Sequence, residues 1–173
     1  ALDIALGRGG DQAVVKKDKK YDFFGGSNVG LEKMSKVKAR AMAQAIRELI
    51  EKSEKVYVMG HRNSDIDCIG AAIGIVKIAK YLGKPVNIIV DAKCNASTEA
   101  LIEKIKYDEN YKDVFKTYAD VKGEDVTNSL LVVVDTHKKS YLVEPEFLDK
   151  YESIAVIDHH RRGPEFIDNA VLT

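Results

Sequence analysis

Short apolar runs alternate with longer amphipathic segments from about residue 30 onward. Four runs are continuously apolar instead of alternating with polar residues, and they predict strands over 55–59, 86–90, 130–134 and 154–157. Strands of this composition are buried on both faces, as in a parallel sheet covered by helices. The pattern therefore predicts an α/β fold with a mostly parallel sheet and helices on both of its faces.

The segments between these runs have helical periodicity. Apolar residues recur every four positions from Val37 to Leu49, which predicts a long helix over 30–53 with a charged outer face. Three shorter helices are predicted over 68–81, 97–106 and 145–150, and the first is ended by Gly83 with Pro85 beyond it. The polar stretch that follows residue 106 predicts no element.

The N-terminal part has a different organisation. The runs 12–16 and 21–24 flank a polar segment and predict a β-hairpin that turns near residue 18. The glycines of 25–28 predict a linker. We therefore divide the chain into residues 1–26, a linker and connecting helix over 27–54, and an α/β domain over 55–173.

Composition narrows the class of protein. The apolar fraction of 45% can build a full core, and 27 basic residues balance 27 acidic ones. Proteins that hold long nucleic acids usually carry a basic surplus, so we expect no such partner and favour a small anionic substrate. Two cysteines, no signal peptide and no long apolar run predict a protein of the reduced cytosol.

All four histidines lie in clusters with aspartate, each directly after a predicted strand. The clusters are His61 with Asp65 and Asp67, Asp135 with His137, and Asp158 with His159 and His160. Parallel sheets bind their ligands beyond the carboxyl ends of the strands. Carboxylates with imidazoles suit Mn²⁺, Mg²⁺ or Fe²⁺. The alternative for the first cluster is a loop of solvated acids in which Asp67 caps a helix, but the three clusters together favour metal binding.

The order His-x-x-x-Asp-x-Asp, a strand ending in Asp, then Asp-His-His resembles the DHH phosphoesterase superfamily. Its members include single-strand exonucleases, oligoribonucleases, family II pyrophosphatases and cyclic dinucleotide phosphodiesterases. The N-terminal sequence ALDIALGRGGDQAVVK resembles the end of the degenerate GGDEF domain of membrane-bound cyclic di-AMP phosphodiesterases. The later sequence MGHRNSDIDCIGAAIGI resembles the first motif of the same enzymes. The resemblance implies a truncated, Rossmann-like N-terminal DHH subdomain, preceded by a GGDEF tail over 1–26. It also implies a cytoplasmic domain whose full-length protein is anchored in the membrane through segments outside this sequence.

The resemblance also implies a set of metal ligands. One ion would be held by His61, Asp65 and Asp135. A second would be held by Asp67, Asp135 and His159, with Asp135 bridging the two. The ions would be Mn²⁺, two per chain, and they would activate water to hydrolyse cyclic di-AMP to linear pApA.

Further residues receive roles beside the metals. The resemblance places His160 against the substrate phosphate as a catalytic residue and gives Asp158 a supporting catalytic role behind the ligands. Arg161 and Arg162 adjoin His160 and are weaker candidates for binding substrate phosphate. His137 either borders the cavity or caps a turn, and Cys68 and Cys94 are interpreted as structural. The motif Gly7-Arg8-Gly9-Gly10-Asp11 lacks the lysine of a phosphate loop and predicts a plain turn.

The sequence departs from the family pattern in ways that keep alternatives open. The family commonly has proline at residue 64 and serine at residue 68, and it adds a fourth aspartate well downstream, for which Asp168 is too close. The DHH-associated C-terminal domain is also missing, so the fragment is expected to hold little of the specificity site. A nanoRNase, exonuclease or pyrophosphatase, or a catalytically silent regulatory module, therefore remain alternatives, and a homo-oligomer stays open.

Overall fold

A computed structural model describes residues 13–17, 20–24, 31–92, 94–160, 165–168 and 170–172, in two units divided at Ala39/Arg40. In the first unit, strands β1 (Ala13–Lys17) and β2 (Lys20–Phe24) pair antiparallel, with Val15 opposite Asp22. The predicted hairpin is thereby confirmed. The predictions for 1–11 and for the linker at 25–28 lie outside the described residues.

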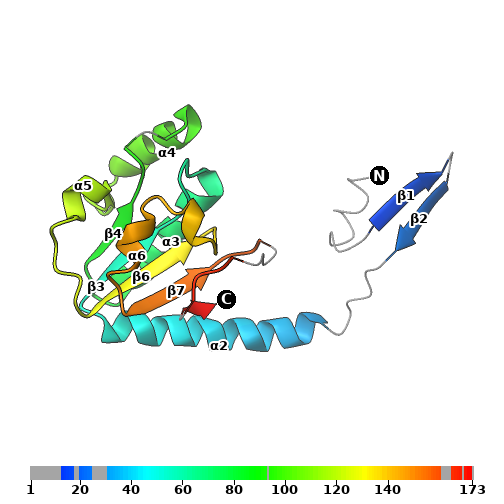
Figure 1. The fold of residues 1–173 in the computed structure, drawn as a ribbon, viewed down its shortest axis with the longest axis horizontal. Coiled ribbons are helices and arrows are strands. Elements are labelled where there is room, and N and C mark those ends of the chain that lie inside the picture. Colours follow the sequence, from blue (N-terminus) through cyan, green and yellow to red (C-terminus); the bar gives the residue numbers. More distant parts are fainter. Residues whose placement is uncertain are drawn as a thin grey trace. The chain divides into compact units, whose positions relative to one another are not determined.

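The second unit is built on a parallel sheet with the strand order β5-β4-β3-β6-β7-β8 (Figure 1). The strands are β3 (Lys55–Met59), β4 (Val86–Ile89), β5 (Phe115–Lys116), β6 (Ser129–Val134), β7 (Ser153–Ile157) and β8 (Val171–Leu172). All five pairings between neighbouring strands are parallel, which confirms the predicted sheet. Numbered from β3, the order is that of the doubly wound nucleotide-binding folds.

The helices agree with the predicted periodicity. They are α2 (Leu31–Lys52), α3 (Ile66–Tyr81), α4 (Ala96–Lys106), α5 (Tyr118–Val121), the 3₁₀ helix η1 (Lys139–Tyr141) and α6 (Pro145–Leu148). The prediction of an element-free stretch after residue 106 was wrong, because β5 and α5 lie there. Each is too short for periodicity to reveal. Among the described residues, no helix combines the length and apolar character needed to cross a membrane.

Helix α3 begins two residues earlier than predicted because Asp65 caps it. The Asp65 carboxylate accepts hydrogen bonds from the backbone N–H groups of Asp67 and Cys68, each at 3.0 Å. This corrects the alternative in which Asp67 was the cap. At the other end of the helix, Gly83 has a φ of +70°, a conformation that glycine adopts without strain.

The sheet is buried on both faces, as the continuous apolar runs predicted. On one face Val56 and Val58 of β3 pack with Ile50 of α2 and with α3 and α4. On the other face Tyr57 and Met59 pack in a cluster with Val121 of α5, with Leu142 directly after η1, and with α6. Burying each such side chain is worth about 1.5–3 kcal/mol. The buried sheet therefore fixes the positions from which the loops at its carboxyl edge begin.

Candidate metal centre

The predicted site lies at the switch point of the sheet, between β3 and β6. These two strands are neighbours, yet the chain leaves them toward opposite edges of the sheet, which opens a crevice at their carboxyl ends. His61 follows β3 and Asp135 follows β6 directly. Asp135 has a φ of +59°, and its N–H still donates to the carbonyl of Ile157 at 2.9 Å. A non-glycine residue in this conformation is uncommon, and such residues concentrate at functional sites.

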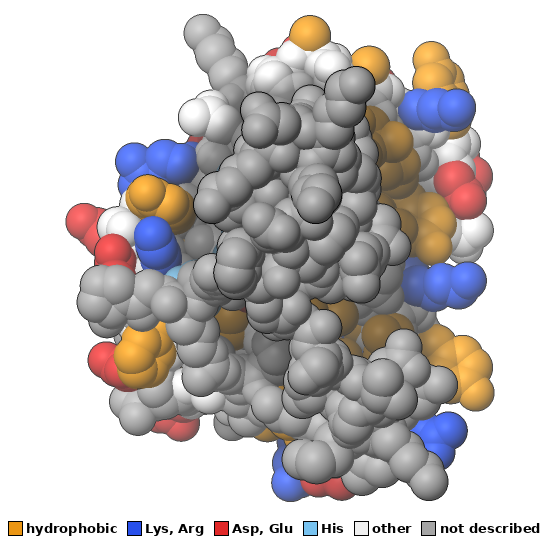
Figure 2. Space-filling model, turned by 90° about the vertical axis from the view of Figure 1, so that its right-hand side faces the viewer, with side chains coloured by type: hydrophobic (Ala, Val, Ile, Leu, Met, Phe, Trp, Pro, Cys, Tyr) orange, Lys and Arg blue, Asp and Glu red, His pale blue; other side chains and the backbone are white. Residues whose placement is uncertain are grey.

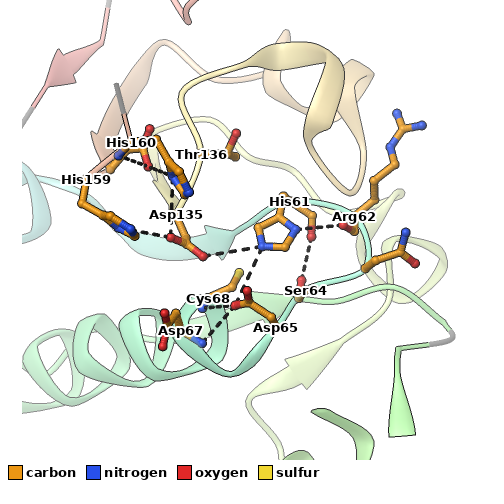
Figure 3. A network of polar contacts seen from close by, with 12 residues as sticks. His61, Arg62, Ser64, Asp65, Asp67, Cys68, Asp135, Thr136, His159 and His160 are labelled. Carbon is orange, nitrogen blue, oxygen red and sulfur yellow. Dashed lines mark hydrogen bonds and ion pairs between the residues drawn. The ribbon is translucent and has the colours of Figure 1, made fainter. Parts of the chain in front are cut away.

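The carboxylate of Asp135 is the centre of the site. Its Oδ2 atom lies 3.5 Å from His61 Nε2, and its Oδ1 atom lies 3.5 Å from His159 Nδ1 (Figure 3). The side chain of Asp135 is 7% exposed, whereas that of His159 is 73% exposed. One buried carboxylate thus presents its two oxygens to histidines from two different strand ends.

The acids of the first cluster divide between the two sides of Asp135. Asp65 Oδ1 lies 4.0 Å from His61 Nε2, on the His61 side. Asp67 borders a cavity that is also bordered by Asp135 and His159. Asp65 and Asp67 are two residues apart at the start of α3, and they also border one further cavity together.

Asp158 is held between two imidazoles. Its Oδ1 lies 2.7 Å from His160 Nδ1, and its Oδ2 is hydrogen-bonded to His137 Nδ1. Burial acts to raise the pKa of Asp158, but the hydrogen bonds from His137 and His160 outweigh it and lower that pKa. The hydrogen bond to Asp158 raises the pKa of His160 in turn. The sequence left the role of His137 open, and the structure places it, 6% exposed, as a partner of Asp158.

Asp135 responds differently to its surroundings. Burial, followed by the negative charge of Asp65, raises its pKa, although three histidines act against this shift. A cation bound beside a buried carboxylate and other acids offsets both the desolvation of the charged carboxylate and the repulsion between the negative charges.

The donors present fit a divalent cation. Ligand atoms of Asp135, Asp158, His159 and His160 all lie within 4.8 Å of one another, and so do those of His61, Cys68 and Asp135. Oxygen and imidazole donors of this kind suit Mn²⁺, Mg²⁺ and Fe²⁺. His61, Asp135 and His159, which were proposed as ligands, are thus brought together around one carboxylate.

Two cavities meet at Asp135. One, of about 710 Å³, is bordered by residues that include Arg62, Lys138 and Tyr141; the other, of about 650 Å³, is bordered by Asp67. The Arg62 guanidinium donates to the carbonyl of Ser140 at 3.1 Å, which ties the loop after β3 to η1. Cavities of this size accommodate a small ligand, and the cationic side chains favour an anionic one. Arg161 and Arg162 lie outside the described residues.

Basic and acidic side chains of the described residues are mixed on one face of the molecule (Figure 2). On the face shown in Figure 2, the described Lys and Arg side chains lie interspersed with Asp and Glu. The whole sequence has zero net charge.

Fold and site together define a doubly wound α/β domain with a candidate histidine–aspartate metal centre at its switch point. The chain belongs to the DHH family: the model of the DHH family N-terminal domain matches residues 55–173.

The chain is also similar to individual proteins. Cyclic-di-AMP phosphodiesterase PdeA of Listeria monocytogenes is 42% identical to it over 99% of this chain and 26% of the relative. A probable manganese-dependent inorganic pyrophosphatase of Bacillus licheniformis is 31% identical over 62% of this chain and 31% of the relative. The crystal structure of an exopolyphosphatase-related protein from Bacteroides fragilis has the same fold, with a TM-score of 0.55 and 17% identity over 77% of this chain and 38% of that one. The chain thus spans about a quarter of the length of PdeA.

Proposed function

We propose that this chain carries the metal-binding part of a phosphodiesterase that hydrolyses cyclic di-AMP to linear pApA. The observation that supports this most strongly is Asp135, whose two oxygens face His61 and His159 at the switch point. The substrate is taken from the similarity to PdeA. The activity would belong to a longer protein, of which this chain is the N-terminal part of the catalytic region.

Two Mn²⁺ ions would be held around Asp135. His61 and Asp65 would complete one position, and Asp67 and His159 the other. The division of the two acids between the sides of Asp135 supports this assignment, and the pyrophosphatase relative supports manganese. When bound, divalent ions at such a site lower the pKa of a coordinated water toward about 7 and offset negative charge on the phosphoryl group.

The side chains of the protein bind and orient the phosphate. His160 is half-exposed beside the larger cavity, and Asp158 fixes its ring through Nδ1. The opposite ring nitrogen, Nε2, is then available to donate a hydrogen bond to a phosphate oxygen, with the raised pKa of His160 favouring its charged form. Arg62 and Lys138 add positive charge at the wall of the same cavity.

The remaining parts of the proposal concern the longer protein. Residues 1–26 would be the end of a GGDEF-like domain, and 27–54 would connect it to the DHH domain. The catalytic region would be cytoplasmic and anchored to the membrane by other segments, and a homo-oligomer remains open.

The proposal is tested with a chain extended through the downstream DHH-associated domain. We expect this protein with Mn²⁺ to convert cyclic di-AMP to pApA faster than it cleaves pyrophosphate or short oligoribonucleotides. Asp135→Asn should abolish the activity, and Asp113→Asn, which changes an exposed aspartate ahead of β5, should not. The pyrophosphatase relative makes preferred cleavage of pyrophosphate the main competing result, and that result would replace the proposed substrate.

A further inference from the structure

Cys68 lies against the proposed metal centre, although the sequence suggested only a structural role. It is 2% exposed, near the start of α3, and Figure 3 shows its sulfur close to Asp65 and Asp135. Its Sγ atom and the ligand atoms of His61 and Asp135 all lie within 4.8 Å of one another. A thiol, an imidazole and a carboxylate therefore surround one point.

The backbone makes room for this thiol. A Cβ atom added to Gly60 would lie 2.0 Å from Cys68 Sγ, so the sulfur occupies space that glycine leaves free at the end of β3. His61 and Asp135 border the larger cavity, whereas Cys68 is buried behind them. An ion that enters from the cavity would meet the thiol as its innermost donor.

The separations allow coordination after a small closure. Bonds of about 2.0–2.3 Å to nitrogen and sulfur place two ligands of one zinc ion at most about 4.4 Å apart. His61 Nε2 and Asp135 Oδ2 lie 3.5 Å apart, inside that limit, and Cys68 Sγ lies within 4.8 Å of the ligand atoms of both residues. Thiolate ligands select soft cations, whereas Mn²⁺ prefers oxygen. Serine, which the family commonly carries at residue 68, would supply no such preference.

We propose that Cys68 is a further ligand of the metal position formed by His61 and Asp135, and that it shifts this position toward Zn²⁺ and Co²⁺. The inference rests on the proposed metal centre. As the metal–sulfur bond forms, the thiol proton is released to solvent, and the ion holds the sulfur as thiolate. The position would then bind a thiophilic cation more tightly than a serine-containing site does.

The test is a Co²⁺ titration of the 173-residue chain, followed by absorption spectroscopy and calorimetry under reducing conditions without added thiol. We expect a near-ultraviolet thiolate-to-cobalt charge-transfer band in the unaltered chain. Cys94→Ser leaves Cys68 as the only thiol of the sequence, so the band should persist there and is then assigned to Cys68 even if a Cys68 variant fails to fold. Cys68→Ser should lose the band and weaken Co²⁺ binding at least about 10-fold, the lower end of what disturbed metal sites lose, with a much smaller change for Mn²⁺.

Bound Co²⁺ without a charge-transfer band would overturn the inference while leaving the metal centre intact. Persistence of the band in Cys68→Ser would overturn it as well. Failure of both Co²⁺ and Mn²⁺ to bind would overturn the inference together with the proposed centre.

Discussion

The side chain of Asp158 shows how burial and hydrogen bonding are balanced within this site. Its carboxylate is 5% exposed and is bonded to His137 on one oxygen and to His160 on the other. Removing one partner leaves a buried charged oxygen without that hydrogen bond, at a cost of about 1–3 kcal/mol. The stability of the domain should therefore depend on His137, which is not among the proposed metal ligands.

We predict that His137→Phe lowers the free energy of unfolding by about 1–3 kcal/mol in urea denaturation. The matched control is a double-mutant cycle with Asp158→Asn. The two changes should be non-additive, because each removes the same hydrogen bond. Strict additivity would show that the interaction between His137 and Asp158 contributes nothing to the free energy of unfolding.

Residues differ in how far the sequence revealed their places in the candidate site. His61, Asp135 and His159 were recognisable because each directly follows an apolar run that ends at the same edge of the sheet. His137 was expected either to border the cavity or to cap a turn, and it does border the larger cavity. Its contact with Asp158, 21 residues further along the chain, was not predicted, because it depends on how the loop after β6 folds. Cys68 was interpreted as structural because a cysteine in an apolar helix pattern gives no signal of what its sulfur faces.

At the scale of elements, the N-terminus of α3 combines two tasks in one side chain. Asp65 caps the helix with two hydrogen bonds and also faces His61. Serine and aspartate are nearly equal as N-caps. Replacing Asp65 with serine therefore keeps the helix cap and removes the negative charge that faces His61.

We predict that Asp65→Ala lowers the free energy of unfolding by about 0.5–2 kcal/mol and also weakens Mn²⁺ binding. Asp65→Ser should retain nearly all of the stability and still lose Mn²⁺ affinity. Thermal or urea unfolding together with a Mn²⁺ titration measures both effects. If Asp65→Ser bound Mn²⁺ as tightly as the unaltered chain, Asp65 would be a cap and not a ligand.

An ion pair between Lys55 and Glu124 joins the start of β3 to the turn after α5. Glu124 accepts hydrogen bonds from Lys55 and from the hydroxyl of Tyr57, and these lower the pKa of Glu124. A carboxyl group with a lowered pKa stabilises the fold above its ordinary pKa, and this contribution is lost as the pH falls through the folded-state value. Because Glu124 is 38% exposed, solvent screening keeps the effect small.

Glu124→Gln should lower the free energy of unfolding by about 0.2–1 kcal/mol at pH 7, as expected for a solvent-screened ion pair. The difference from the unaltered chain should shrink to zero as the pH is lowered below about 4. Urea denaturation at several pH values measures it, with the exposed Glu152→Gln as the control. A difference that stayed constant with pH would assign the loss to packing and not to charge.

Elements were predictable to within about two residues where they were long or continuously apolar. The boundaries of β3 and β6 follow from their apolar runs, and Gly83 marks the end of α3. Strands β5 and β8 have two residues each and exist only through pairing with a neighbour, which no local pattern encodes. The strand order itself required the structure, since the apolar runs predict only that the sheet is mostly parallel.

For the whole molecule, the strand order explains why three separate motifs form one site. β6 lies directly beside β3, and β7 lies beside β6, so the ends of these three strands are adjacent although 74 residues separate Asp135 from His61 and 23 separate it from Asp158. The buried apolar faces hold these ends in register. Bringing the acids together is electrostatically unfavourable, and the effect is seen at Asp135. Its pKa is raised by burial and by the negative charge of Asp65.

The central claim, a metal pair bridged by Asp135, is tested most directly by calorimetric titration of this chain with Mn²⁺. We predict two ions in the unaltered chain, the loss of both in Asp135→Ala, and no change in Asp113→Ala. Retention of two ions in Asp135→Ala would contradict the bridged centre, and so would the absence of any binding in the unaltered chain.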